Sequence, residues 1–308
     1  MVMKKRNGFT LLEMLVVIGI IAILGSVMLA QFSGSTESAM ATSCMNNMRT
    51  LCNAVMAEGS KESFYPSAGP YQYLEIGSKE KYWYQGWIGQ GEGGSAVSCY
   101  HTDEGEAQHH AITNGTTWRT IGGNLSAYVC PSHIKFCKRA KKPMPSWTYV
   151  MNSYFGWDYG TAGDVEAGRR GYGSGFFTFK YTSAPKSRRR PIEKVLLFAE
   201  IPYAENEVKN AGFSTSAEDG NDAILQYAAD SGESAKADKS AKGNGESIGF
   251  NHKTGKTYAA HVAFADGHCA KLMLPTAGGA DNAKNLTTWL CTGQEYTFNG
   301  SQYQKVSE

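Results

Sequence analysis

The stretch RNGFTLLEMLVVIGIIAIL, Arg6–Leu24, sets the expected architecture of the chain. From Phe9 to Ala30 there are 22 residues with one charged side chain, that of Glu13. As an α-helix this run would be about 33 Å long, close to the roughly 30 Å of a bilayer's hydrocarbon core. We therefore expect residues 9–30 to form a transmembrane helix with one carboxylate near its start.

Basic residues precede this run and set its expected orientation. Lys4, Lys5 and Arg6 are consecutive, and positively charged flanks favour the cytoplasmic side of a membrane. A secretory signal peptide would have a shorter apolar core followed by a small-residue cleavage site. We therefore expect a single-pass anchor in the inner membrane, with the C-terminal domain in the periplasm or outside the cell.

The helical pattern continues beyond the apolar run. No proline occurs in residues 31–58, and apolar residues recur every three or four positions. This spacing predicts one helix of about 50 residues, with a transmembrane half at 9–30 and an amphipathic half at 31–60. The recurring apolar positions are Met40, Cys44, Met48, Cys52 and Val55.

Glu13 is the costly residue of this segment. A carboxylate within a transmembrane helix costs about 2.5 kcal/mol or more unless it is paired or near the interface. In one interpretation Glu13 lies one turn from the helix start, and its carboxylate reaches the headgroups. In the other it has a positively charged partner inside the membrane. The residues alone leave both interpretations open.

The basic leader, Gly8, the run Phe9-Thr10-Leu11-Leu12-Glu13 and the apolar stretch together resemble the type IV prepilin signal. Type IV pilins and the pseudopilins of type II secretion systems share this signal. The resemblance implies that a prepilin peptidase cleaves after Gly8, where a missing side chain lets the enzyme approach the backbone, and N-methylates Phe9. It also implies that Glu13 pairs with the Phe9 amine of a neighbouring subunit, so that each buried charge has a partner.

Four fragments of the body resemble a family of prepilin-like proteins named for a C-terminal histidine, nine residues and Asp-Gly. The motif residues would be His252, Asp266 and Gly267, although thirteen residues separate this histidine from the Asp-Gly pair. The family's body has no defined biochemical activity to carry over. The fragments are YVCPS (Tyr128–Ser132), SWTYVMNSY (Ser146–Tyr154), KVLLFAE (Lys194–Glu200) and NHKTGKTYAAHVAFADGH (Asn251–His268).

The chain after residue 60 is rich in Gly, Tyr, Trp and Ser with short apolar runs, which favours strands and turns. With the resemblance, this predicts an α+β, pilin-like fold in which the long helix packs on an antiparallel β-rich domain at 61–308, after a leader at 1–8. A polar stretch at about 204–246 is expected to be a surface insertion whose removal leaves the fold intact.

The strongest hairpin pattern surrounds Asp266-Gly267, a dipeptide favoured in two-residue type I′ turns. In such a hairpin Ala265 would face His268, and Asp266 would tolerate a positive φ. The predicted strands are 126–130, 147–151, 175–181, 194–200 and the hairpin 258–274. A short apolar piece, TTWLC, in the tail after Asp281 is expected to pack back on the body.

The chain has seven cysteines, an odd number for an exported protein, so at least one lies outside any intramolecular disulfide. Cys130 and Cys137 frame a short loop and are the candidate disulfide pair. The alternative is that both are independent buried thiols.

Whether the chain binds a metal is left open, and no other cofactor is expected. In a two-residue hairpin His261 and His268 would lie about 13 Å apart, too far to share one ion. Some pseudopilins bind calcium near the C-terminus, so the resemblance leaves Ca²⁺ near Asp266 open. The cluster CYHTDEGEAQHH at 99–110 and the basic run KSRRR at 186–190 are expected to be solvated loops.

The overall charge excludes one class of partner. Thirty basic residues face 28 acidic ones, and removing Lys4, Lys5 and Arg6 leaves 27 against 28, a net charge of −1. A body with this balance lacks the basic surface that nucleic-acid binding needs.

Two functions are compatible with these patterns. The first is a non-enzymatic subunit of a type IV pilus or a type II secretion pseudopilus, with the prepilin peptidase, the membrane and other pilin or pseudopilin subunits as partners. The second is an exported enzyme or binding module that uses the helix only as an anchor. No G-x-S-x-G, H-E-x-x-H or Walker motif occurs in the sequence, so we favour the first and expect no catalytic residues.

Overall fold

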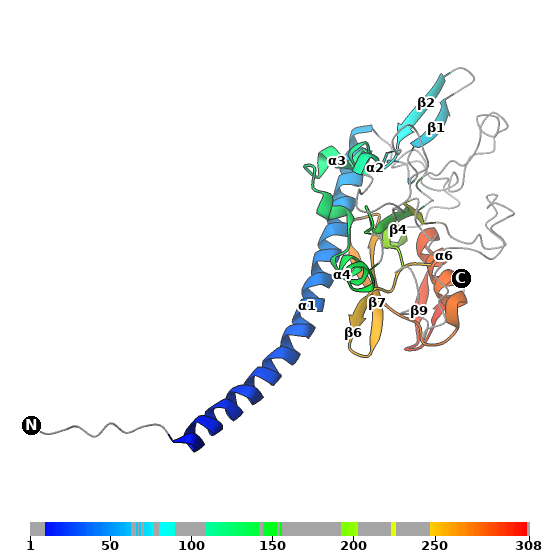
Figure 1. The fold of residues 1–308 in the computed structure, drawn as a ribbon. Helices are drawn as coiled ribbons and strands as arrows, with labels where there is room; N and C mark the ends of the chain where they lie inside the picture. The colour runs from blue at the N-terminus through cyan, green and yellow to red at the C-terminus, as the bar shows by residue number, and fades with distance from the viewer. Residues whose placement is uncertain are drawn as a thin grey trace, which may run out of the picture. The chain divides into compact units, whose positions relative to one another are not determined.

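The computed structural model describes residues 10–62, 66, 68, 71–76, 80–89, 109–141, 144–152, 155, 192–202, 223–225 and 247–306. The chain divides into two compact units, Met1–Met40 and Ala41–Glu308. Elements carry the labels shown in Figure 1. Gly8, Phe9, the strand expected at 175–181, the basic run at 186–190 and residues 99–108 lie outside the described residues.

The long helix is confirmed as α1 (Leu11–Glu62), which has 52 residues. It begins with a reciprocal capping box. The N–H of Glu13 donates to Thr10 Oγ1 over 3.2 Å, and the Thr10 N–H and hydroxyl both donate to Glu13 Oε2 over 2.8 Å. This exchange satisfies backbone donors that the first turn of a helix leaves without intrahelical partners.

The first part of α1 has an apolar surface on all sides. The large apolar side chains between Leu11 and Leu24 are exposed, from 45% at Val17 to 87% at Leu11. Within the part of the chain that the structure describes, no helix is long and apolar enough to cross a membrane.

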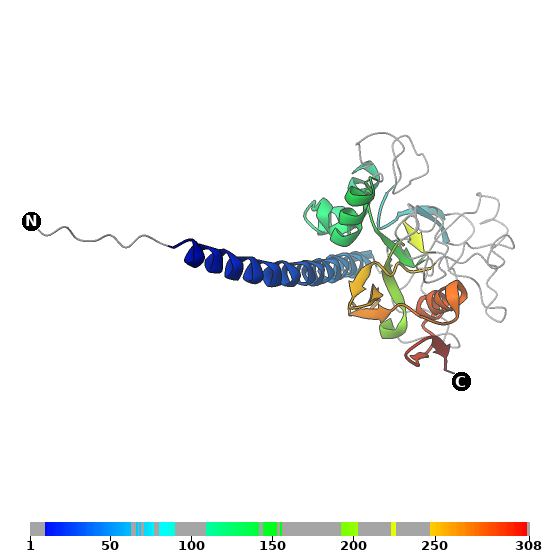
Figure 2. The ribbon, with the colours of Figure 1, turned by 60° about the horizontal axis from the view of Figure 1, so that its bottom comes forward.

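The unit Ala41–Glu308 is built around a six-stranded sheet, which confirms the predicted antiparallel β-rich body (Figures 1 and 2). The strand order is β5-β3-β4-β7-β6, and β8 also pairs with β7. All pairs are antiparallel except β3 with β5. The strands are β3 (Tyr149–Asn152), β4 (Leu196–Glu200), β5 (Ile224–Leu225), β6 (His252–Thr254), β7 (Thr257–Phe264) and β8 (Cys269–Met273).

Smaller elements complete the unit. Two hairpins pair β1 with β2 and β9 with β10, and α6 contains the TTWLC piece, whose Leu290 and Cys291 are buried as expected. The strands are β1 (Tyr71–Ile76), β2 (Glu80–Gln85), β9 (Tyr296–Phe298) and β10 (Tyr303–Lys305). The helices are α2 (His109–Thr113), α3 (Thr117–Thr120), α4 (Pro131–Ala140) and α6 (Gly279–Thr292), with 3-10 turns η2 (Leu125–Tyr128) and η5 (Ile192–Lys194).

The predicted amphipathic face of α1 contributes to the core of this unit. Cys44, Met48, Cys52 and Val55 are fully buried, and Leu51 joins them. They belong to one apolar cluster with the central strands and several aromatic rings. Burial of each such side chain stabilises the fold by about 1.5–3 kcal/mol, so the helix and sheet form one cooperative core.

One strand prediction and one prediction of a surface insertion need correction. Residues 126–130 are not a strand, because the Asn124 side chain accepts the Ser126 N–H over 3.1 Å and caps the 3-10 turn η2, and Pro131 then starts α4. The stretch 204–246 is not wholly a surface insertion. It contains β5, whose Leu225 is buried and pairs with Asn152 of β3.

The β7–β8 hairpin forms as predicted, but its register differs by one residue. His261 faces Lys271, and Ala263 faces Cys269, so three residues rather than two make the turn. The positive φ of +88° lies at Gly267 and not at Asp266. A three-residue loop ending in a left-handed glycine is the next common hairpin type, and it changes which side chains are opposite each other.

The predicted disulfide between Cys130 and Cys137 is also wrong. Cys130 is the N-cap of α4, Cys137 lies in that helix, and the two thiols are not bridged. Seven helical positions separate the two α-carbons by about 10 Å, beyond the roughly 7 Å that a disulfide can span.

Candidate functional site

A tight hairpin brings two histidines onto one face of the sheet. In the turn between β6 and β7, Thr254 faces Thr257, and Gly255 has a positive φ of +61°. His252 faces Ala259 in this register, so His261 lies two residues further along the same face. The two imidazole rings have their centroids 4.0 Å apart.

A carboxylate lies beside these two histidines, that of Glu200, the last residue of β4. The pairing of Ala199 with Val262 continues so that Glu200 lies beside His261 on β7. Its Oε1 atom lies 2.7 Å from His252 Nε2 and 3.7 Å from His261 Nδ1. Strand register therefore assembles two imidazoles and a carboxylate at one point of the sheet.

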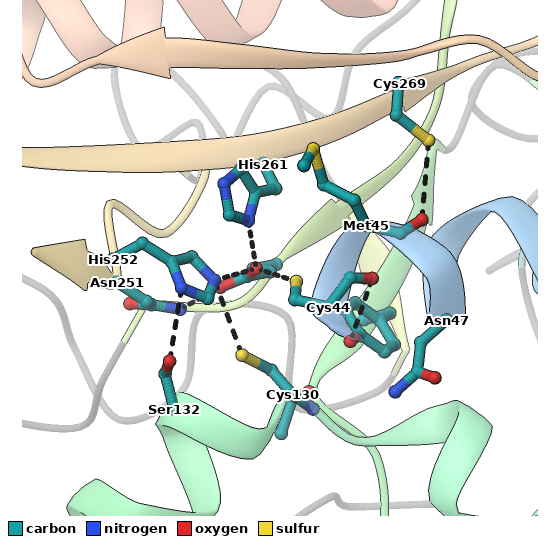
Figure 3. Close-up of polar contacts among 12 residues, drawn as sticks. Cys44, Met45, Asn47, Cys130, Ser132, Asn251, His252, His261 and Cys269 are labelled. Carbon is teal, nitrogen blue, oxygen red and sulfur yellow. Dashed lines mark hydrogen bonds and ion pairs between the residues drawn. The ribbon is translucent and has the colours of Figure 1, made fainter. Parts of the chain in front are cut away.

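The long helix α1 contributes a thiol beside the two imidazoles and the carboxylate. The Cys44 thiol, on the buried face of α1, donates a hydrogen bond to Glu200 Oε1. Figure 3 shows the side chains of Cys44, His252 and His261 converging between α1 and the sheet. The Tyr149 hydroxyl also donates to the Cys44 carbonyl over 3.5 Å. One ligand-type atom from each of Cys44, Glu200, His252 and His261 lies within 4.8 Å of the others. We call these four residues the buried cluster.

Neighbouring polar groups orient the cluster. The Asn251 amide donates to Glu200 Oε2 and to the Ile201 carbonyl, each over 2.8 Å. Ser132 Oγ, in the first turn of α4, lies 3.2 Å from His252 Nδ1, and Cys130 Sγ lies 3.5 Å from His252 Nε2 (Figure 3). These contacts fix the carboxylate plane and leave Nε2 as the histidine atom that faces the cluster.

Burial and charge act against each other in this cluster. Burial alone would raise the pKa of Glu200 and lower that of His252, but their attraction reverses both effects. The pKa of Glu200 is lowered to about 2, and that of His252 is raised to about 10. At neutral pH the two therefore form a carboxylate–imidazolium pair.

The other two members are uncharged. Burial lowers the pKa of His261 to about 4, so its imidazole is neutral at pH 7. Burial, with the nearby Glu200 charge, raises the pKa of Cys44 well above its usual value, so its thiol keeps the proton. The cluster thus offers one carboxylate, one thiol and two imidazoles in a single place.

The cluster is closed to solvent. No member is more than 1% exposed. A cavity of about 560 Å³ lies elsewhere, beside the end of α1, where Glu58, Lys61 and Arg119 are among its lining residues. A group that a substrate cannot reach is not suited to nucleophilic catalysis, so the cluster favours a structural or metal-binding role.

Of the predicted motif residues, the structure brings only His252 into the cluster. Asp266 lies in the β7–β8 turn, where its Oδ1 accepts the His268 N–H over 3.1 Å and lies 2.6 Å from His268 Nδ1. Gly267 lies in the same turn, where an added Cβ would be 3.6 Å from Asn53 and Met56 of α1. Calcium binding at Asp266 stays a prediction.

Cys44, Glu200 and His261 were missed as site residues. Cys44 fits the apolar pattern of α1, and Glu200 is the last residue of an apolar strand. Neither position therefore requires a functional site to explain its residue type. The usable signal was the pair His252 and His261 on either side of Thr-Gly-Lys, because a two-residue turn there puts both on one face.

Comparison with known proteins bears on the N-terminal segment. Residues 3–29 match the family described as the prokaryotic N-terminal methylation motif. No curated protein and no solved structure matches the chain. The matched residues include Gly8, Phe9 and Glu13. The helix α1 begins within the match, at Leu11, and leads into an antiparallel β-sheet body. The chain thus carries the prepilin-type signal of type IV pilins and pseudopilins, joined to an α+β body consistent with the pilin-like fold.

Proposed function

We propose that this chain is the precursor of a pilin-like or pseudopilin-like structural subunit. A prepilin peptidase cleaves it between Gly8 and Phe9 and methylates the new terminus. The subunit is then assembled through α1 into a type IV pilus or a type II secretion pseudopilus. The observation that carries this proposal is the match of residues 3–29 to the methylation motif.

The exposed surface of α1 supports assembly through the helix. The helix displays large apolar side chains on all sides from Leu11 to Leu24. A helix that is apolar all round needs apolar surroundings. In this proposal the membrane provides them before assembly, and the same helices of neighbouring subunits provide them in the filament.

The capping box places Glu13 one turn from the start of α1, close to the terminus that cleavage would create. In the single chain the Glu13 carboxylate is already satisfied by two donors of Thr10. Cleavage after Gly8 creates an ammonium group on Phe9, the residue before this cap. In the filament Glu13 then pairs with the Phe9 ammonium of a neighbour, which gives two charges in an apolar environment their partners.

The proposal is tested by N-terminal peptide mass spectrometry on the protein extracted from its native cells. A terminus at Phe9 with one added methyl group is the expected result. A terminus at Met1 would contradict processing, and a cut beyond Ala30 would make this an ordinary secreted protein. Gly8→Ala should stay uncleaved in the same assay, with Gly19→Ala as the matched control that is still cleaved.

A further inference from the structure

We propose that the buried cluster binds one Zn²⁺ ion, with Cys44, Glu200, His252 and His261 as its four ligands. This site lies in the unit Ala41–Glu308, so it is independent of processing and assembly at the N-terminus. Its role is structural: the ion joins the long helix to three strands of the sheet.

The donor atoms are those that zinc uses in proteins. Zinc is bound by cysteine sulfur, histidine nitrogen and carboxylate oxygen, and structural sites have four protein ligands. One thiolate and two imidazoles make the set too soft for Mg²⁺ or Ca²⁺, which select oxygen ligands. The cluster is closed to bulk solvent, since none of its members is more than 1% exposed, and this favours four protein ligands.

The geometry is close to that of a bound site. With bonds of about 2.0–2.3 Å, the ligand atoms of a tetrahedral zinc site lie roughly 3.5 Å apart. Here the four candidate atoms lie within 4.8 Å of one another, and His261 Nδ1 is 3.7 Å from Glu200 Oε1. Glu200 Oε1 contacts the other three side chains, since it lies 2.7 Å from His252 Nε2 and 3.7 Å from His261 Nδ1 and accepts the Cys44 thiol. In the proposed site the carboxylate rotates slightly to make space for the ion.

His261 provides an independent sign of a ligand. It is 1% exposed, and its Nδ1 atom makes no hydrogen bond to any residue that the structure describes. A buried polar atom without a hydrogen bond costs about 1–3 kcal/mol. That nitrogen is directed at Glu200 Oε1, the side of the ring on which the ion would lie.

The surrounding groups are also those of a metal site. A histidine ligand generally donates its other ring N–H to a nearby acceptor, and Ser132 Oγ lies 3.2 Å from His252 Nδ1. Ligating carboxylates are hydrogen-bonded in turn, and Asn251 holds Glu200 Oε2 at 2.8 Å. Both contacts leave the ligand atoms, Nε2 and Oε1, facing the centre.

The charge balance suits a buried position. A thiolate and a carboxylate contribute two negative charges, the two imidazoles are neutral, and Zn²⁺ brings the total to zero. When the ion enters, the Cys44 thiol and the protonated His252 ring each release one proton to solvent. Two positive charges leave as one Zn²⁺ binds, so the net charge of the cluster does not change. The bound site contains no net buried charge, which is the condition for placing ionised groups in a core.

The first measurement is zinc content. The full chain, purified in detergent and dialysed against excess zinc and then metal-free buffer, should hold one zinc per chain by elemental mass spectrometry. Cys44→Ser keeps a hydroxyl donor for Glu200 but removes the sulfur ligand, and its zinc content should fall at least tenfold. Cys52→Ser, a buried cysteine two turns further along α1, is the matched control and should keep its zinc.

The second measurement identifies the ligands. Replacing zinc with Co²⁺ should give the intense visible bands of a tetrahedral site and a sulfur-to-cobalt charge-transfer band, both absent in Cys44→Ser. His261→Gln should lose zinc and keep the circular dichroism of the folded body, which separates loss of a ligand from loss of the fold. Zinc that persists in Cys44→Ser and His261→Gln, or an unaltered chain without zinc, would overturn the proposal.

Discussion

Glu200 and His252 lie 52 positions apart in the chain and form a buried ion pair, with 2.7 Å between Oε1 and Nε2. In the metal-free protein, removal of either partner leaves an uncompensated charge or an unsatisfied polar group. A change of charge at either residue should therefore destabilise the body strongly.

Glu200→Gln should lower the free energy of unfolding of the metal-free protein by about 3–5 kcal/mol, because His252 loses the charge that holds its proton. The measurement is urea unfolding followed by circular dichroism, in the presence of a chelator. Glu193→Gln, at an exposed position of η5, is the control and should change stability by less than about 0.5 kcal/mol. A loss below about 1 kcal/mol for Glu200→Gln would contradict the ion pair.

His133 should make the body sensitive to acid. It is fully buried in α4, and burial lowers its pKa to about 4 from an ordinary value of 6.5. Its folded pKa lies below its unfolded pKa, so the stabilisation is complete above pH 6.5 and is lost as the pH falls towards 4. That loss amounts to about 3 kcal/mol from this residue.

The check is urea unfolding of the unaltered chain and His133→Gln at several pH values. The variant cannot take up a proton at this position, so its stability should fall less between pH 6.5 and 4. Both proteins share every other titrating group, so the difference between the two slopes reports His133 alone. Parallel slopes would show that His133 does not titrate as described.

Substitutions at the start of α1 should separate helix capping from charge pairing. Thr10→Ala breaks the capping box, which costs about 1 kcal/mol locally, but it keeps the Glu13 charge. Glu13→Gln keeps an acceptor for Thr10 and loses the charge. If pairing with the Phe9 ammonium governs assembly, Thr10→Ala subunits enter filaments and Glu13→Gln subunits do not.

Sheared filament fractions, quantified by immunoblot, measure this difference, and N-terminal mass spectrometry confirms that both variants are still cleaved at Gly8. Incorporation of Glu13→Gln at the level of the unaltered subunit would remove the pairing argument. The capping box would then be the whole explanation for this carboxylate.

The role of β5 in the core can be tested by substitution. This strand lies in the stretch 204–246, which the sequence predicts to be a surface insertion. Leu225 is 1% exposed and pairs with Asn152 on β3. Leu225→Ala should destabilise the body by about 2–5 kcal/mol because it removes buried methyl groups and leaves a cavity. Thermal unfolding checks this, with exposed Lys253→Ala as the control; equal melting temperatures for the two variants would exclude β5 from the core.

The long helix and the central strands could be predicted because their signals are local. The spacing of Cys44, Met48, Cys52 and Val55 specifies a buried helical face without knowledge of the partner strands. The turn at Gly267 was placed one residue wrongly, since Asp-Gly is compatible with both two- and three-residue loops. Only the strand register distinguishes them.

The buried cluster could not be predicted, because it depends on register between segments that are remote in sequence. Cys44, Glu200 and His261 come from α1, β4 and β7. Each has an adequate local explanation, and only the pairing of Ala199 with Val262 shows that two of them adjoin. The histidine pair alone had a local signal, in the Thr-Gly-Lys turn.

The position of Cys44 on α1 has a mechanical consequence for a filament subunit. Tension along a filament held together by its helices would enter the body through α1. At Cys44 the helix is linked to Glu200 at the end of β4, and two turns later Cys52 lies 3.9 Å from the Phe264 carbonyl of β7. The pull would be shared among neighbouring strands of one sheet and load them as a group, so the strands would resist together instead of peeling apart one at a time.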